Sequence, residues 1–444
     1  VAEWGSPRVA ILAAVFYTAA PFHLAEMYRF FLYAEFAATA FLPFCLLYLT
    51  RICRERGFAN TVLFAVSFSL LILTHLPLTI IATLCFFIYA LLVVDVRLWR
   101  ITAFQVLTAG ILASLLTSFY WIRVVIELDW VSHAQSIYWL SLSDGNLILF
   151  PFSLNGLDLP GYLQNLYRHF DVMVILTSTL LMPFLVLLAK ERSSLTPPAG
   201  RVLIALSLTT VFCLLMLARP SEFLWLNLSF LQRLQFPWRW LSVASVFAGA
   251  AFSVSFAFLV KGGYLRSRAA VIACLSLMLI VIAYDIRVIS AAPGRFQQEE
   301  FNSVVSDFQS EPASEFWWPI WAKSGAFGNT MPVSAGERSV EISIWEPTRR
   351  KFIVHEGIPV ELRIATFYYP YWHAAVDGVE LTIAMDQNGV ISLPVRYQRS
   401  EIILWFEEPV IYFFAKWTSA VAWLLIGGFQ CLRLVEFVRR RYRR

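Results

Sequence analysis

Long apolar runs separated by short polar segments dominate the chain up to about residue 290. A run of roughly 17–25 apolar residues is long enough to cross the hydrocarbon core of a bilayer as a helix. About ten runs approach or reach this length, and the first two are short. They lie near residues 8–22, 35–50, 58–74, 78–94, 101–121, 171–189, 202–218, 241–260, 269–289 and 411–431. This pattern predicts a polytopic α-helical membrane protein.

Basic residues cluster in every second segment between these runs, and this sets the expected orientation. Cytoplasmic loops of membrane proteins carry an excess of lysine and arginine. The five clusters are Arg51, Arg54 and Arg56; Arg97 and Arg100; Lys190, Arg192 and Arg201; Lys261, Arg266 and Arg268; and Arg439, Arg440, Arg441, Arg443 and Arg444. We therefore expect these segments and the C-terminal tail to be cytoplasmic. The loops at 21–34, 127–171 and 219–240 are then exoplasmic.

The hydrophobic pattern changes at about residue 291, at the end of a multi-span module covering 1–290. Segments 340–345 and 360–365 alternate apolar and polar residues, which is the period of half-buried strands. Asp377-Gly378 is typical of a two-residue hairpin turn, and Gln387-Asn388-Gly389 predicts a second turn. We expect 291–409 to fold as an exoplasmic antiparallel β-sandwich, followed by a final span and basic tail at 410–444.

The β-rich region has two alternative roles. It can be structural and cap the membrane module. Alternatively, it can bind carbohydrate through aromatic side chains that we expect to be exposed, namely Tyr368, Tyr369, Tyr371 and Trp372.

Composition supports the membrane assignment and excludes several functions. Only 15% of the residues are charged, against about 25% in soluble domains. The net charge of +5 comes from short loops, so it indicates topology rather than a nucleic-acid partner. The six cysteines and six histidines form neither a disulfide framework nor a metal motif. No glycine-rich nucleotide motif is present, so we expect no cofactor.

The stretch PFHLAEMYRFFLYAE, residues 21–35, places four ionisable residues between two apolar runs. Such groups are costly near a bilayer unless they are functional or face water. His23, Glu26 and Arg29 recur at three-residue intervals and would form one polar strip on a helix. This strip predicts an interfacial helix with a Glu26–Arg29 pair, or a functional site. Glu35, at the edge of a span, is either a catalytic carboxylate or a second partner for Arg29.

Two further segments carry polar groups at the ends of predicted spans. In QFPWRW, Trp238 is typical of an interfacial aromatic belt, with the Arg239 side chain reaching toward water. The alternative is that Arg239, helped by Arg233, binds phosphate. His75 either forms an interhelical hydrogen bond or contacts a substrate.

Three motifs at span ends and one in the β-rich region carry a resemblance to known families. They are Tyr17…Pro21…Tyr28-Arg29…Ala34-Glu35…Pro43, Thr74-His75-Leu76-Pro77, LQFPWRW at 234–240 and FYYPYWHAAVDGVELTI at 367–383. The first three resemble the bacterial and archaeal membrane proteins called 6-pyruvoyl-tetrahydropterin synthase-related. The fourth is similar to the C-terminal β-domain of YfhO-like membrane proteins. Both families resemble the GT-C class of glycosyltransferases, which implies a GT-C-like bundle in a bacterial or archaeal plasma (inner) membrane.

Relatives in these families carry an upstream span and a first exoplasmic loop with acidic and histidine residues. Nothing in this chain matches that loop, and the sequence begins at Val1 without a methionine. We therefore expect an N-terminally truncated fragment or a processed product. The pterin name implies no activity here, because the sequence lacks a zinc–histidine site of that kind.

The resemblance implies that a sugar passes from a polyprenyl-phosphate donor to a glycan or protein acceptor at the exoplasmic face, in envelope glycan assembly. Such a reaction needs a carboxylate to accept the acceptor proton and cationic groups to hold the leaving phosphate. The expected catalytic residues are Glu35 and Glu26. The expected substrate-binding residues are Arg29, His75, Arg233, Trp238 and Arg239.

Two non-enzymatic alternatives stay open. The chain can be a membrane scaffold or export factor for cell-surface polysaccharide, using the β-domain to hold glycan or a partner. A transporter built from broken helices is a weaker alternative, because few glycines interrupt the spans and no inverted repeat is evident.

Overall fold

The structure, a computed structural model, divides into two compact units. Unit 1 comprises Val1–Thr117, Gln135–Arg295 and Leu425–Arg444, and unit 2 comprises Ser118–Ala134 and Phe296–Leu424. The described residues are 7–28, 30–55, 57–131, 161–190, 199–232, 234, 236–262, 267–290, 302, 318–328 and 331–442.

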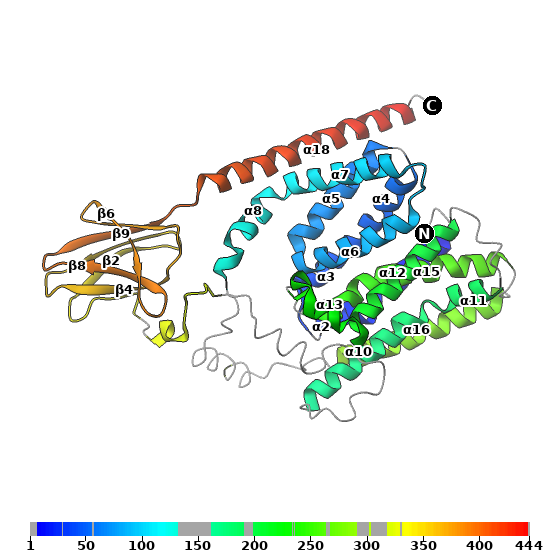
Figure 1. Cartoon of the computed structure of the whole chain (residues 1–444), viewed down its shortest axis with the longest axis horizontal. Coiled ribbons are helices and arrows are strands. Elements are labelled where there is room, and N and C mark those ends of the chain that lie inside the picture. Colours follow the sequence, from blue (N-terminus) through cyan, green and yellow to red (C-terminus); the bar gives the residue numbers. More distant parts are fainter. Residues whose placement is uncertain are drawn as a thin grey trace. The chain divides into compact units, whose positions relative to one another are not determined.

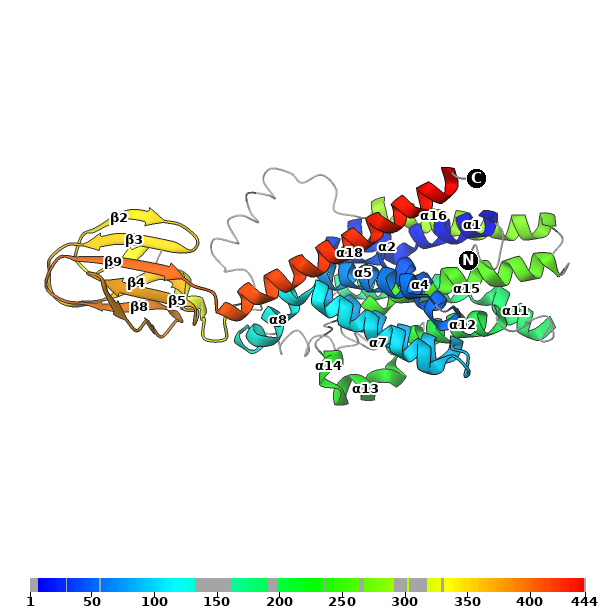
Figure 2. The same ribbon diagram turned by 90° about the horizontal axis from the view of Figure 1, so that it is seen from above.

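Unit 1 is helical, and many of its helices lie side by side with roughly aligned axes (Figures 1 and 2). In chain order they are α1 (Pro7–Thr18), α2 (Pro21–Tyr28), α3 (Tyr33–Thr39), α4 (Leu42–Arg54), α5 (Phe58–Thr74), α6 (Leu76–Val93), α7 (Trp99–Leu116), α10 (Gly161–Thr179), α11 (Met182–Lys190), α12 (Ala199–Leu217), α13 (Glu222–Asn227), α14 (Ser229–Gln232), α15 (Trp240–Lys261) and α16 (Ser267–Ser290). Two 3₁₀ turns, η2 (Arg219–Ser221) and η3 (Pro237–Arg239), precede α13 and α15.

Eight segments within the described residues are helical, long and apolar enough to cross a membrane. They are Val9–Tyr28, Tyr33–Arg54, Leu76–Val93, Trp99–Leu116, His169–Ala189, Ala199–Leu217, Pro237–Lys261 and Val410–Arg433. The other two predicted runs are the shorter helix α5 and helix α16. The protein is therefore a multi-pass membrane protein by helix length and hydropathy.

The helix α15 is central to the core of unit 1. It packs against α12, α1 and α11, and its buried residues extend around the whole helix. A helix that is apolar on all sides is typical of such a position. Small residues including Ala244, Ala248 and Gly249 allow neighbouring backbones to approach closely. A Cβ atom at Gly249 would lie 3.9 Å from the carbonyl oxygen of Ala13 on α1.

The first two candidate spans are broken helices. The chain leaves helical geometry after Thr18 and begins α2 at Pro21, a residue favoured at the first position of a helix. The next break, near Phe31, separates the two spans, and the φ of Phe31, 54°, lies in the left-handed region. The second span is itself interrupted at residues 40–41, between α3 and α4. These breaks place α2 and α3 as short helices with Glu26 and Glu35 near the junction between them.

Unit 2 contains two antiparallel sheets that pack as a sandwich (Figures 1 and 2). The first has the order β1 (Val333–Ser334), β4 (Val360–Phe367), β8 (Val390–Val395), β7 (Ala384–Met385). The second has the order β2 (Val340–Trp345), β3 (Arg349–Val354), β9 (Ser400–Phe406), β5 (Trp372–Val376), β6 (Val379–Leu381). The remaining elements of unit 2 are α8 (Ser118–Glu127), η1 (Leu128–Trp130), η5 (Ser324–Gly328) and the first part of α18 (Val410–Tyr442).

Alternating residues of both sheets form the core of the sandwich. Leu362 and Ile364 of β4 are buried with Phe352 of β3 and with Ile402 and Leu404 of β9. This confirms the predicted alternation for segment 360–365. Segment 340–345 differs, because β2 is an edge strand with an irregularity in its pairing after Ile342 and its side chains are mostly exposed.

Both predicted turns are confirmed. Asp377 and Gly378 have φ values of 50° and 81° and join β5 to β6. These are the left-handed conformations that a two-residue hairpin loop requires. Gly389, with φ 76°, ends the loop between β7 and β8.

Candidate functional site

Five polar side chains from four parts of unit 1 meet inside the helical bundle. We call Glu26, Glu35, His75, Arg239 and Ser242 the carboxylate cluster. Glu26 lies on α2 and Glu35 on α3, His75 lies between α5 and α6, and Arg239 and Ser242 lie where η3 passes into α15. Glu26 is 0% exposed, Glu35 1% and Arg239 5%. The two carboxylates and the guanidinium are thus removed from solvent, so their charges must be balanced by groups within the bundle.

Ser242 links the two carboxylates. Its Oγ lies 2.7 Å from Glu26 Oε1 and 3.3 Å from Glu35 Oε1. A hydroxyl group has one proton and can donate it to one acceptor at a time. The shorter distance favours donation to Glu26, so Ser242 holds that carboxylate in place.

Arg239 is the cationic partner of Glu35. Arg239 Nε and Glu35 Oε2 lie 3.0 Å apart, but the N–H is not aligned for a hydrogen bond, so the contact is an ion pair. Arg239 Nη1 donates to the carbonyl oxygen of Leu234 at 2.8 Å. The guanidinium carbon lies 5.4 Å from the ring centroid of Phe236. These contacts fix the guanidinium and make Glu35 its ion-pair partner.

His75 faces Glu35 as a neutral imidazole. The backbone N–H of Leu78 donates to His75 Nδ1 at 3.2 Å, so the proton of the neutral ring is on Nε2. Burial, together with the nearby Arg239 charge, lowers the pKa of His75 to about 3. His75 Nε2 lies 3.9 Å from Glu35 Oε2, which is too long for a direct hydrogen bond. Its N–H is therefore available to a bound group.

A second pair, buried His23 and half-buried Tyr17, borders the cluster. His23 Nδ1 donates to the carbonyl oxygen of Tyr17 at 2.9 Å, and the two rings meet edge to face at 4.7 Å. The Tyr17 hydroxyl donates to the carbonyl oxygen of Thr39 at 2.6 Å. These bonds tie α1, α2 and α3 together around Glu26.

Tyr17 also lines a cavity of about 430 Å³ between α1, α4 and α15. Its walls are largely aliphatic and include Ala13, Leu46 and Val246. An elongated apolar ligand suits such a cavity better than a sugar does.

The structure brings together four of the seven expected site residues, namely Glu26, Glu35, His75 and Arg239. Trp238 is half-buried and points elsewhere, stacking on Phe236 at 4.3 Å and Phe170 at 4.8 Å. Arg29 and Arg233 lie outside the described residues.

The environment of the stretch at 21–35 differs from the sequence interpretation. His23 and Glu26 were expected on the polar surface of an interfacial helix, but both are buried in the bundle. The segment Pro21–Tyr28 is indeed helical, and it belongs to the candidate span Val9–Tyr28. Glu26 contacts Ser242 of α15 instead of solvent, because α2 packs inside the bundle rather than at its edge.

Sequence reasoning missed Ser242. A serine two residues into an apolar helix carries no signal of its own, since many serines in such helices bond to their own backbone. Its position three residues after Arg239 was the one available hint, because residues three apart share a helix face.

The aromatic residues proposed for carbohydrate binding are less exposed than expected. Trp372 is buried in the sandwich core, and Tyr368, Tyr369 and Tyr371 are half-buried. Tyr369, Tyr371 and Trp372 pack around Phe406 at the end of the sandwich, and Tyr368 contacts Trp321.

Within the described part of the chain, no group of three or more His, Cys, Asp or Glu side chains is placed to hold a metal ion. No protein-family model, curated protein or solved structure matches the chain. A functional proposal therefore rests on the geometry of the carboxylate cluster.

Proposed function

We propose that the protein is a GT-C-like membrane glycosyltransferase that uses a polyprenyl-phosphate sugar as donor. The observation that supports this proposal is the meeting of two buried carboxylates, one arginine and one neutral imidazole at Ser242. Ionisable residues within membrane helices are costly and are usually functional. This set supplies both a proton acceptor and a positive charge for a phosphate.

In the proposed reaction, an acceptor hydroxyl oxygen attacks the anomeric carbon of the donor sugar. The bond from that carbon to the phosphate oxygen breaks, and its electron pair leaves with polyprenyl phosphate. The acceptor proton passes to a carboxylate, and the configuration at the sugar carbon inverts. The reaction written in this way needs neither a nucleotide nor a redox cofactor.

Glu26 is the better proton acceptor of the two carboxylates. Arg239 already balances the charge of Glu35. Glu26 Oε2, in contrast, has no hydrogen-bond partner among the residues that the structure describes. In this proposal Glu35 positions Arg239 and Glu26 takes the proton.

The leaving phosphate needs cationic or hydrogen-bonding groups as its charge develops. Arg239 is the described guanidinium at the cluster, and His75 Nε2–H can donate beside it. Arg29 and Arg233 remain proposed sources of further positive charge, and Trp238 a proposed wall for the donor.

The aliphatic cavity bordered by Tyr17 is the proposed site of the isoprenoid chain. Transfer of an apolar chain from water into such a cavity is favourable in proportion to the area buried. The donor would then have its lipid between α1, α4 and α15 and its phosphate near Arg239. We place this reaction at the exoplasmic face of a bacterial or archaeal plasma membrane, with the C-terminal tail in the cytoplasm.

A non-catalytic scaffold or export factor is the second candidate, and one observation favours it. Glu26 and Glu35 are almost completely buried and bonded within the bundle. A buried polar network of this kind can specify how helices pack without having any catalytic role.

Transfer assays on the protein in membranes test the first candidate against the second. The assay would supply radiolabelled polyprenyl-phosphate sugars and a crude acceptor extract. We expect Glu26→Gln to lower transfer by at least about a hundredfold, the usual contribution of a general base. Glu55→Gln, at an exposed residue between α4 and α5, is the matched control and should transfer normally. Folded Glu26→Gln and Arg239→Ala variants that transfer at the parental rate, or a lack of transfer with every donor, would favour the scaffold.

A further inference from the structure

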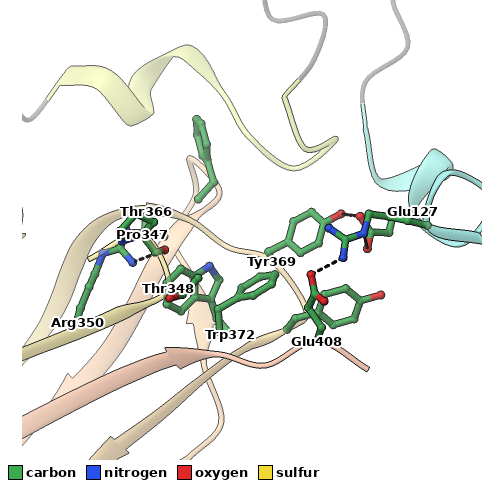
Figure 3. A pocket seen from close by; sticks show the side chains of 12 residues that line it. Glu127, Pro347, Thr348, Arg350, Thr366, Tyr369, Trp372 and Glu408 are labelled. Atoms are coloured by element: carbon green, nitrogen blue, oxygen red, sulfur yellow. Dashed lines mark hydrogen bonds and ion pairs between the residues drawn. The ribbon is translucent and has the colours of Figure 1, made fainter. Parts of the chain in front are cut away.

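A second pocket lies wholly within unit 2, at the end of the sandwich near the last residues of β4 and β9. Its volume is about 470 Å³, within the range of small-molecule sites. Arg350 of β3, Tyr369 and Tyr371 of the β4–β5 connection, Trp372 of β5 and Phe406 of β9 contribute to its wall (Figure 3). We call it the Arg350 pocket.

Arg350 is a buried guanidinium without an acidic partner among the described residues. The residue is 9% exposed, and its guanidinium carbon lies 4.7 Å from the ring centroids of both Trp345 and Trp372. Its Nη1 donates weakly to the carbonyl oxygen of Pro347 at 3.4 Å, and its Nε has no acceptor in the described structure. A guanidinium has five N–H donors, so most of its capacity is unused.

This arrangement is energetically unusual. Burial lowers the pKa of Arg350, which reflects the cost of removing the cation from water. The faces of the two tryptophan rings offset part of that cost. An anion in the pocket would offset the rest through bidentate hydrogen bonds, which arginine forms with carboxylate and phosphate groups.

Arg123 of α8 provides a contrast within the same pocket. Its guanidinium is paired with Glu408 and also lies 4.0 Å from Glu127. Glu127 in turn accepts a hydrogen bond of 2.6 Å from the Tyr369 hydroxyl. Figure 3 shows Glu127 and Glu408 on the far side of Tyr369 from Arg350. The acidic groups of the pocket therefore already have cationic or hydroxyl partners, whereas Arg350 has no acidic partner among the described residues.

The wall between these two ends is aromatic. Tyr369 and Tyr371 lie 5.6 Å apart between ring centroids, and Phe406 lies 5.9 Å from Tyr371 and 5.4 Å from Trp372. Aromatic rings provide flat apolar surfaces at low conformational cost. The apolar face of a sugar ring matches such a surface, and the carboxylates beyond Tyr369 can accept hydrogen bonds from sugar hydroxyls.

We propose that the Arg350 pocket binds an acidic sugar unit, whose carboxylate or phosphate contacts Arg350 and whose ring lies against the aromatic wall. The pocket belongs to a different unit from the carboxylate cluster. Binding there therefore does not depend on the transfer activity proposed above, and a binding assay can succeed where a transfer assay fails.

Affinity measurements on the purified full chain test this proposal. The probes are trigalacturonic acid, galactose 6-phosphate and the neutral sugars galactotriose and galactose, followed by tryptophan fluorescence and by calorimetry. We expect at least one acidic probe to bind about tenfold or more tightly than its neutral counterpart, as the loss of hydrogen bonds to a charged group predicts. The stronger of the two acidic probes would identify the anionic group as a carboxylate or a phosphate.

Two variants assign the binding to Arg350. Arg350→Gln should lower affinity for the acidic probe by about tenfold or more, with little effect on the neutral sugar. Arg349→Gln is the matched control, because Arg349 precedes it on β3, is exposed and does not line the pocket. Equal affinity for acidic and neutral probes, no binding of either acidic probe, or equal effects of the two substitutions would overturn the proposal. The comparison between probes uses the unmodified protein, so it stands even if Arg350→Gln fails to fold.

Discussion

At the scale of single residues, the two carboxylates of the cluster differ in their partners. Glu35 is paired with Arg239, whereas Glu26 accepts a hydrogen bond from Ser242. Replacing Glu35 by glutamine leaves the buried Arg239 guanidinium without its anion, and breaking such a pair costs about 3–5 kcal/mol. Glu26→Gln leaves the pair between Arg239 and Glu35 in place, and the new amide oxygen would still accept a hydrogen bond from Ser242. We therefore expect Glu26→Gln to cost about 1 kcal/mol or less. Thermal unfolding of the purified protein in detergent should show a clearly larger drop in midpoint for Glu35→Gln.

Two further variants make this comparison specific. Glu35→Gln combined with Arg239→Met should recover part of the lost stability, because it removes the unpaired charge as well. Glu55→Gln, on an exposed residue, should leave the midpoint unchanged. Equal losses for Glu26→Gln and Glu35→Gln would show that the pairing of Arg239 with Glu35 is not the dominant interaction.

The same residues show how far the sequence could predict the site. Glu26, Glu35, His75 and Arg239 were each recognisable as ionisable groups beside apolar runs. Their convergence was not predictable, since Ser242 lies 216 and 207 positions from its two carboxylate partners. Periodicity indicates which face of a helix is apolar but not which helix packs against it. For that reason the sequence offered Arg29 as the partner of Glu35, whereas the described structure pairs Glu35 with Arg239.

At the scale of elements, the two hairpin glycines differ in what surrounds them. Gly378 has φ 81° and open space around the position of a Cβ atom, while a Cβ at Gly389, φ 76°, would lie 2.4 Å from the carbonyl oxygen of Trp321. Gly378→Ala should cost about 1–2 kcal/mol from its left-handed backbone alone. Gly389→Ala adds a backbone clash and should cost more.

Unfolding of unit 2 in the full chain, followed by tryptophan fluorescence, measures this difference. Gly378→Asn is the control, because asparagine tolerates the left-handed conformation and should cost less than alanine. If Gly389→Ala proves as stable as Gly378→Ala, the close approach of the Trp321 backbone would not be a property of the folded protein.

Short sequence motifs predicted an element well where the backbone preferences of one or two residues determine its conformation. Asp377-Gly378 specified its turn because few other dipeptides adopt two successive left-handed conformations. Segment 340–345 had an equally clear alternation, yet β2 is an edge strand and most of its side chains are exposed. Whether an alternating strand is central or at an edge depends on its neighbours, which its own sequence does not specify.

At the scale of the whole molecule, the apolar runs predicted a multi-pass helical protein and the alternating segments predicted a β-sandwich after it, and both are present. Length and composition determine whether a helix can span a bilayer, so these features were accessible from the sequence. The breaks before Pro21 and at residues 40–41 were harder to predict, because they divide two short apolar runs into pairs of helices that together reach spanning length.

The distribution of arginine and lysine predicts which side of the membrane each unit's exposed residues occupy. Arg97 in the loop after α6 and Arg100 in the first turn of α7 predict that this end of the two helices is cytoplasmic, whereas the β-sandwich should be exoplasmic. We expect a cysteine replacing exposed Glu380 of β6, in a cysteine-free background, to react with a membrane-impermeant maleimide in intact cells. A cysteine replacing exposed Arg97 should react only after the cells are permeabilised, which also controls for its reactivity. Labelling of the Arg97 position in intact cells, with the Glu380 position protected, would invert the topology and place the Arg350 pocket in the cytoplasm, away from any exoplasmic glycan.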